Sequence, residues 1–95
     1  MSLSALEKWY ASQCNGEWEH GCGVRIDTLD NPGWHVQIQL QGTKKQEATL
    51  VPVKLTRSQD DWIFYWVEKQ EFQITCGPEN LSEAIDLFVS WFNSV

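Results

Sequence analysis

The sequence predicts an α+β domain: a five-stranded antiparallel β-meander with an N-terminal and a C-terminal helix packed on the sheet. Apolar residues recur every three to four positions near both ends of the chain, which is the spacing of an amphipathic helix. Between these ends, several short stretches alternate apolar and polar residues, as strands with one wet face do. We therefore expect residues 1–95 to fold as a single domain.

The two helices are expected at residues 1–14 and 81–95. In the first, Leu3, Leu6 and Trp9 share one face, and the Asn-Gly pair that follows tolerates the left-handed conformation of a helix end. In the second, Asn80 and Glu83 have the spacing of a capping box. The apolar stripe of this helix is the stronger of the two, so it should pack on the apolar face of the sheet.

Five strands are expected at residues 22–28, 34–40, 48–56, 62–67 and 72–76. In the turn that joins the first two, Pro32 presets φ and Gly33 is expected to take a positive φ. Pro52 cannot donate to a strand ladder, so the third strand should lie at an edge or carry a bulge. The fourth stretch is apolar at successive positions, and we expect it to be the central strand, covered on at least part of each side.

Composition and charge narrow the functional classes. The net charge of −6 speaks against binding nucleic acid, which requires clustered Lys and Arg. The charge alternates along the chain: residues 1–42 hold five acids and two bases, residues 43–57 one acid and four bases, and residues 58–95 seven acids and one base. Such an acidic surface is either simply solvated or a face for a basic partner.

Location and redox state follow from what the sequence contains. No apolar run approaches the roughly 18 residues of a membrane span, and the N-terminus does not resemble a secretory signal. We therefore expect a cytoplasmic protein with no membrane partner. Cys14, Cys22 and Cys76 are an odd number of cysteines, which excludes a full disulfide framework and favours reduced thiols.

Two acidic, aromatic segments are the candidate partner-binding residues. Tryptophans in loops either fold back onto the core or contact a partner. A Trp that begins a strand on its apolar face, as Trp34 does, is more often part of the core, whereas Trp18 fits either place. If the hairpin between the first two strands brings both segments together, they present carboxylates rimmed by aromatic rings, which suits a binding hot spot. The predicted residues are Glu17, Trp18, Glu19, His20, Asp30, Asn31 and Trp34, with Asp60 and Asp61 as a second acidic spot.

Enzymatic and metal-binding alternatives stay open at this point. The spacing of Cys14, His20 and Cys22 does not match the common zinc patterns, which rely on closely spaced cysteine pairs. Next to Cys76 the sequence supplies Glu79, and an acid disfavours the thiolate that nucleophilic catalysis needs. We predict no catalytic residue, metal or other cofactor, and retain a small cysteine- or carboxylate-dependent enzyme and a zinc-binding module as alternatives.

Four motifs give the sequence a family resemblance. LEKWY at residues 6–10, SQCNGEWEH at 12–20, TLDNPGW at 28–34 and GPENL at 77–81 together resemble the immunity protein 53 family of bacterial polymorphic toxin systems. The resemblance implies a cytoplasmic antidote, a monomer or homodimer, that binds a cognate toxin and has no catalytic residues to carry over. It does not identify the toxin. Our hypothesis is a toxin with a basic active site, such as a nuclease, which the acidic residues would cover.

Overall fold

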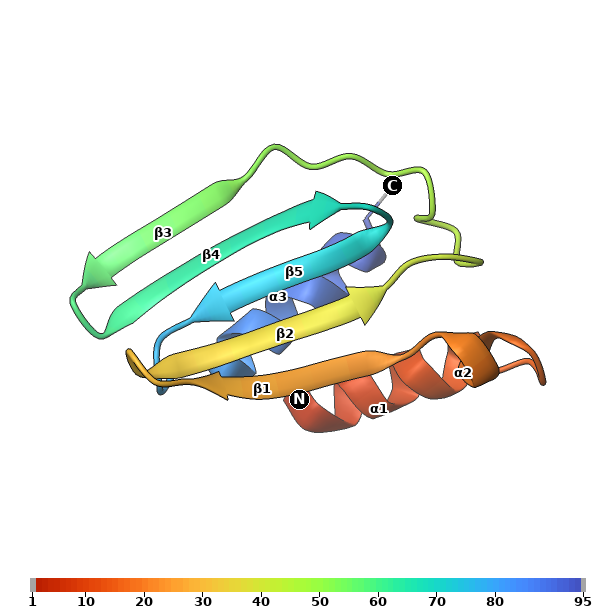
Figure 1. Ribbon diagram of the computed structural model, residues 1–95, viewed down its shortest axis with the longest axis horizontal. Coiled ribbons are helices and arrows are strands. Elements are labelled where there is room, and N and C mark those ends of the chain that lie inside the picture. Colours follow the sequence, from red (N-terminus) through yellow and green to blue (C-terminus); the bar gives the residue numbers. More distant parts are fainter. Residues whose placement is uncertain (1, 95) are drawn as a thin grey trace.

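The computed structural model describes residues 2–94 as one antiparallel sheet with helices on one of its faces (Figure 1). The elements in chain order are α1 (Ser2–Gln13), α2 (Trp18–Gly21), β1 (Val24–Leu29), β2 (Gly33–Gln39), β3 (Val53–Ser58), β4 (Asp61–Glu68), β5 (Glu71–Cys76) and α3 (Leu81–Phe92). The predicted α+β class is confirmed, with a five-stranded antiparallel sheet and a helix at each end of the chain.

The order of the strands differs from the predicted meander. The sheet runs β1-β2-β5-β4-β3, so β5 lies at the centre and β4 lies second from the edge. After β2, residues 40–52 carry the chain to the far edge, and β3, β4 and β5 then fill the sheet back toward β2. The central position matches the burial of β5, where Phe72, Ile74 and Cys76 are all fully buried.

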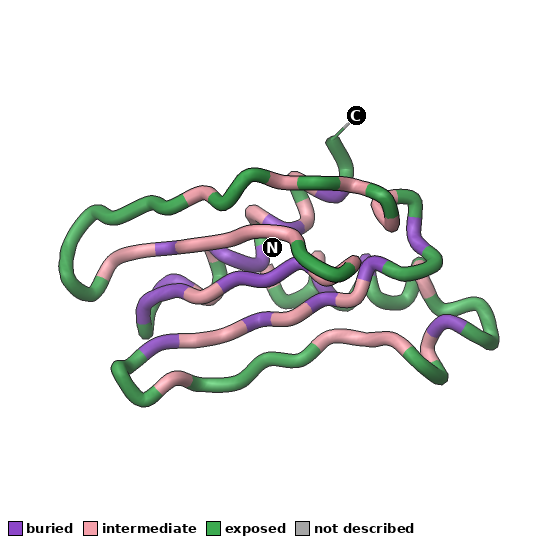
Figure 2. The backbone as a smooth tube through the Cα atoms, turned by 45° about the horizontal axis from the view of Figure 1, so that its top comes forward, coloured by how far each residue is buried: buried purple, intermediate pink, exposed green. Residues whose placement is uncertain are grey.

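Both edge strands are exposed along most of their length (Figure 2). The third strand was predicted over residues 48–56, but β3 begins at Val53, so Pro52 lies just outside it. Its predicted edge position is confirmed, because β3 pairs only with β4. Its register with β4 also shifts between Thr56 and Ser58, as at a β-bulge. Missing ladder donors and irregular pairing are tolerated at an edge because that side of the strand faces solvent.

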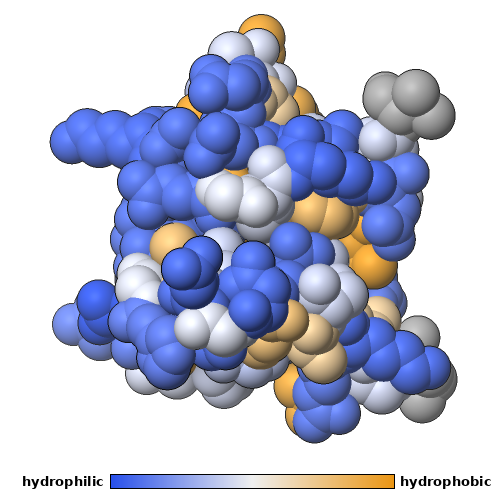
Figure 3. All heavy atoms as spheres, turned by 90° about the vertical axis from the view of Figure 1, so that its right-hand side faces the viewer, coloured by the Kyte–Doolittle hydropathy of each residue, from blue (hydrophilic) through white to orange (hydrophobic). Residues whose placement is uncertain are grey.

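The end of the molecule that carries α2 and the β4–β5 turn presents mainly hydrophilic side chains (Figure 3). Lys69 and Gln70 form this turn with φ angles of 51° and 61°. Two consecutive left-handed residues are typical of a type I′ turn, whose twist matches that of the strands it joins. The turn is tied to the next loop, since the Leu40 amide donates to the Gln70 carbonyl at 2.8 Å.

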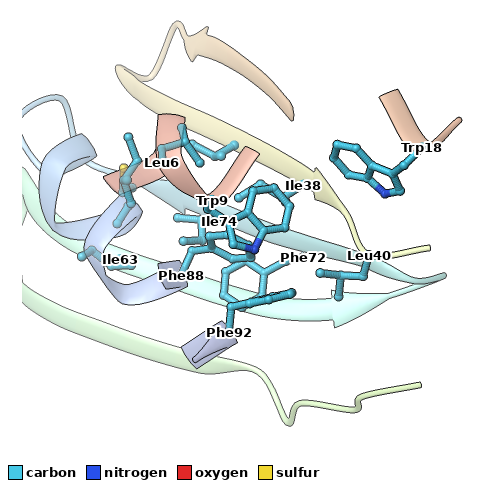
Figure 4. Packing of buried hydrophobic residues seen from close by; sticks show 14 residues of the cluster. Leu6, Trp9, Trp18, Ile38, Leu40, Ile63, Phe72, Ile74, Phe88 and Phe92 are labelled. Atoms are coloured by element: carbon cyan, nitrogen blue, oxygen red, sulfur yellow. The ribbon is translucent and has the colours of Figure 1, made fainter. Parts of the chain in front are cut away.

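Aromatic rings join the two long helices to the sheet (Figure 4). The Trp9 indole of α1 meets Phe88 and Phe92 of α3 edge-on, at centroid distances of 4.9 and 5.3 Å. Phe88 in turn contacts Phe72 of β5 at 5.1 Å. Burying each of these side chains contributes about 1.5–3 kcal/mol by transfer arithmetic, so the aromatic cluster is a main source of stability.

The structural roles predicted for Gly33 and Asn80 are wrong. Gly33 does not lie in the left-handed region; it is buried at the start of β2, where an added Cβ would stand 2.3 Å from the Cys76 carbonyl oxygen. Close approach of two strands therefore explains this glycine. Asn80 precedes α3, but its side chain does not cap the helix and instead accepts the Trp62 amide at 3.2 Å. The predicted partner in that capping box, Glu83, binds Arg57.

Candidate functional site

The predicted acidic and aromatic cluster is divided between the two ends of the sheet. Residues 17–20 lie just before β1, whereas Asp30 and Asn31 lie just after it (Figure 1). The length of β1 separates them by about 17 Å at the usual rise per residue. Trp34 pairs with Thr28 near the far end of β1. The expectation that the hairpin makes the two segments neighbours is therefore wrong, because they lie at opposite ends of β1.

Trp18 is part of the core. Its side chain is only 8% exposed and meets the Trp9 indole edge-on at 5.8 Å. Its indole N–H donates to the Gln41 carbonyl at 2.7 Å, which satisfies the one polar atom of the ring. A ring fixed in this way closes the end of the sheet beneath α2, so the core interpretation of Trp18 holds.

The carboxylates beside Trp18 differ in their surroundings. Glu19 accepts the Asn15 amide at 2.9 Å and the Gly16 amide at 2.8 Å. The pKa of Glu19 is lowered, first by its own backbone amide and then by those two donors. Glu17 and His20 are exposed. Glu19 thus holds the loop after α1 in shape, and only Glu17 and His20 extend freely toward solvent.

The remaining predicted residues gather at the opposite end. Because β2 and β4 are both antiparallel to β5, they begin at the same end of the sheet, which places Asp30, Asn31 and Trp34 at the same end as Asp60 and Asp61. We call this region the acidic end. Its carboxylates are Asp30, Asp60, Asp61, Glu79 and Glu83.

The segment after β5 connects the two halves of the acidic end. The Trp34 indole N–H donates to the Pro78 carbonyl at 2.9 Å, and the Asn80 amide group donates to Asp61 at 2.9 Å. Trp34 is half-buried and packs against the core. Its ring therefore supports the acidic end from beneath, with its polar atom already bonded.

Arg57 organises the carboxylates of this end. It donates to Asp61 at 2.8 and 3.0 Å and forms a two-pronged contact with Glu83. Hydrogen bonds from Arg57 are the main cause that lowers the pKa of both Asp61 and Glu83. These three residues border a hollow of about 400 Å³, and Asp60 and Glu79 also line it.

Most of the acidic charge here faces solvent. Asp30, Asp60 and Glu79 are exposed, and no ion pair involves them within residues 2–94. Exposed, unpaired carboxylates, of which Asp60 and Glu79 line the hollow, can attract cations and basic protein surfaces.

The three cysteines differ in how far they are buried. Cys76 is fully buried in β5, and burial raises the pKa of its thiol to about 11, far from that of a nucleophilic thiolate. Cys14 is exposed and Cys22 is half-buried. Among residues 2–94, His, Cys, Asp and Glu side chains do not form a group of three or more that could hold a metal ion.

One group of surface aromatic residues was not among the predicted site residues. Trp62, Phe64 and Trp66 of β4 lie on the face of the sheet that α1 and α3 leave uncovered. The signal was present in the sequence, since this strand is apolar at successive positions. We expected that pattern to reflect cover on both faces, whereas helices cover only one.

Comparison with known proteins decides the family. The sequence model of immunity protein 53 matches residues 3–93. The chain belongs to the immunity protein 53 family. No curated protein and no solved structure matched it. Within the described residues of this family member, no helix has the length and apolar character needed to cross a bilayer.

Proposed function

We propose that this immunity protein 53 family member binds a cognate bacterial toxin in the cytoplasm and neutralises it by stoichiometric occlusion, without catalysis. Family membership over residues 3–93 carries the proposal. The chemistry of the side chains supports it, because the most deeply buried thiol is poorly ionised and the exposed carboxylates are solvated. Tight binding suits such a role, since nuclease–immunity pairs are among the tightest complexes known.

The acidic end is the proposed position for the toxin's basic groups. Asp30, Asn31 and Asp60 are exposed there, while Trp34 and Asp61 hold the surrounding segments in place. A nuclease is the toxin class that fits best, because its active site must attract phosphates with positive charge. Carboxylates placed over that site would compete with the nucleic acid substrate. Glu17 and His20 at the other end are a separate, smaller surface, and Trp18 and Glu19 serve the fold.

Co-expression tests the function directly. Cells that express the toxin encoded by the neighbouring reading frame should survive when this chain is co-expressed, and the purified proteins should form a one-to-one complex. Rescue should persist when Cys14, Cys22 and Cys76 are all replaced by Ser or Ala, whereas a cysteine-dependent enzyme would lose it. Absence of both rescue and complex formation with that toxin would overturn the proposal.

Charge reversal tests the acidic end. The double variant Asp30→Lys and Asp60→Lys changes exposed residues, so the fold should persist while toxin affinity falls at least about tenfold. Glu7→Lys with Glu47→Lys is the matched control, because it makes the same change in charge on two exposed residues away from the acidic end. Equal affinity loss in both variants would argue for a general charge effect instead of this site.

A further inference from the structure

The uncovered face of the sheet carries a row of three aromatic side chains. Strand alternation places Trp62, Phe64 and Trp66 on this face, because Ile63 and Tyr65 between them point into the core. The three side chains are half-exposed, and the rings of Phe64 and Trp66 lie 4.8 Å apart. We call these three residues the aromatic row. Three large rings side by side on an uncovered face form an apolar patch, which marks a candidate contact surface.

A hollow borders the row on the side of β3. Lys54 pairs with Phe64 across the strands and Thr56 pairs with Trp62. The Lys54 ammonium lies 5.2 Å from the centre of the Phe64 ring, so it supports that ring by a cation–π contact. The hollow measures about 350 Å³, and its lining residues are Lys54, Thr56, Ser58, Gln59, Trp62 and Phe64. It has the size and the largely apolar walls to receive one side chain of a partner.

Hydrogen-bonding side chains border the row on the other side. Thr75 pairs with Phe64, and Gln73 pairs with Trp66. Beyond them, His35 Nε2 lies 2.8 Å from Gln73 Oε1. Gln73 is buried and its amide is bonded to His35 and Glu71, so Thr75 and His35 are the polar groups that a partner can reach. Aromatic anchors bordered by such groups have the make-up of a protein-binding surface, where the rings supply most of the affinity.

Negative charge stands at both ends of the row. The acidic end lies where β4 begins, and Glu68 and Glu71 face each other directly across the strands where it ends. Like charges in this position are destabilising. Trp66 Nε1 donates to Glu68 and Gln73 Nε2 donates to Glu71, both at 2.8 Å. No ion pair within residues 2–94 joins either carboxylate to Lys69 in the intervening turn.

We propose that the aromatic row is the surface on which the toxin docks, through a toxin face with an apolar centre and basic side chains near both ends. This inference rests on the proposed function. The two acidic groups are separated by the length of β4, about 24 Å, which is the span the toxin's basic residues must match. The row would supply the anchoring contacts and the carboxylates would orient the toxin.

Charge favours the toxin over a second copy of this chain as the occupant. In a two-fold dimer through this face, the row of one copy would cover that of the other. Antiparallel rows would bring the acidic end of one copy against Glu68 and Glu71 of its mate, and parallel rows would oppose identical acids. Either arrangement sets carboxylate against carboxylate, which costs several kcal/mol at an interface. A basic partner removes this repulsion at both ends.

Substitution of the row tests the proposal. The probe is the toxin domain encoded by the neighbouring reading frame, titrated by calorimetry into wild type and into Trp62→Thr, Phe64→Thr and Trp66→Thr. Threonine favours strands, so it removes each ring while keeping the local structure. At least one variant should bind about 30-fold more weakly, since anchoring aromatics dominate interfaces. Leu55→Thr is the matched control, because Leu55 lies on the opposite face of the same hairpin.

The outcomes separate this inference from the proposed function. If wild type does not bind the toxin, the proposed function fails. If wild type binds and all three folded variants keep its affinity, the aromatic row is not the docking surface and the function stands. A free wild-type dimer that Trp66→Thr converts to a monomer in sedimentation, with unchanged toxin affinity, would assign the row to self-association and overturn the inference.

Oxidative footprinting supplies a test without substitution. Toxin binding should protect Trp62 and Trp66 from hydroxyl-radical oxidation by at least about threefold on the hot-spot picture of a desolvated anchor. Trp91 of α3 packs against the core from the helix side of the sheet and serves as the internal control. Protection of Trp91 with continued oxidation of Trp62 and Trp66 would place the toxin on the helix side.

Discussion

At the level of single residues, two glycines allow elements to meet where a side chain would collide. A Cβ on Gly33 would lie 2.3 Å from the Cys76 carbonyl oxygen, and one on Gly77 would lie 2.4 Å from the Asp60 carbonyl oxygen. Both neighbours are backbone atoms, which cannot move aside as a flexible side chain can. These contacts fix how closely β2, β5 and the β3–β4 turn approach at the acidic end.

Replacing Gly33 by Ala should therefore destabilise the protein. We expect the free energy of unfolding to fall by about 1–3 kcal/mol, the usual cost of forcing extra volume into a packed region. Urea denaturation followed by tryptophan fluorescence would measure it. Gly21→Ala is the control, because a Cβ there meets nothing within 4 Å, and its unfolding free energy should stay within about 1 kcal/mol of wild type. Equal stability of Gly33→Ala and wild type would contradict this account.

The sequence could predict that position 33 requires glycine, but it could not predict the reason. Its place in a Pro-Gly pair favoured a turn role, whereas the constraint comes from Cys76, which is distant in sequence. The same limit applies to Trp18. Its neighbours Glu17 and Glu19 made the segment look like a surface site, and only the contact with Trp9 reveals the core position. Local composition does not encode which distant atoms a side chain meets.

At the level of elements, alternation predicted where strands lie but not how they are ordered. Period-two patterns are local, while strand order depends on which strand needs cover on both edges and both faces. The predicted central strand, β4, is apolar on both faces, yet β5 occupies the centre. The predicted proximity of the two site segments was wrong for a similar reason. A strand of six residues separates the two segments that we expected to be neighbours.

Arg57 links three elements: it lies on β3 and binds Asp61 of β4 and Glu83 of α3. Both carboxyl groups have a pKa below their ordinary values, mainly because Arg57 donates hydrogen bonds to them. In the unfolded chain these groups titrate near pH 4. Their contribution to stability is therefore present above about pH 4 and is lost as the pH falls through the lowered folded values.

The variant Arg57→Gln should lose stability in a pH-dependent way. At pH 7 its unfolding free energy should lie below that of wild type, by a small amount because all three groups are partly exposed. As the pH falls below about 4 the difference should shrink toward zero, since the protonated acids no longer gain from Arg57. Paired urea titrations at pH 7 and pH 2.5 measure this. A difference that grows on acidification would contradict the assigned direction.

At the level of the whole molecule, the basic side chains of residues 43–57 contact groups of the protein itself. Lys44 lies over Phe92 at 5.3 Å and Lys45 over Trp91 at 5.0 Å, so both cover the end of α3. Lys54 covers an aromatic ring of β4, and Arg57 neutralises two carboxylates. In the folded molecule these four cations are thus engaged with their neighbours, while many of the acids remain exposed.

Association with a basic toxin should therefore slow as salt rises. A net charge of −6 steers an oppositely charged partner over distances that salt screens, with a Debye length of about 30 Å at 0.01 M and about 8 Å at 0.15 M. We expect the association rate with the toxin of the neighbouring reading frame to fall at least about tenfold between these salt concentrations, while the dissociation rate changes far less. Stopped-flow tryptophan fluorescence measures the association rate.

The exposed acids provide the control for this steering. Asp30→Asn with Asp60→Asn removes two negative charges from residues that make no ion pair within residues 2–94, and it should flatten the salt dependence by lowering the rate at low salt. At 0.5 M salt the rates of variant and wild type should converge, because screening has removed the long-range attraction from both. An association rate that is independent of salt, or that rises with it, would mean that the toxin surface is not basic, and the carboxylates at the two ends of β4 would then have no charge to meet.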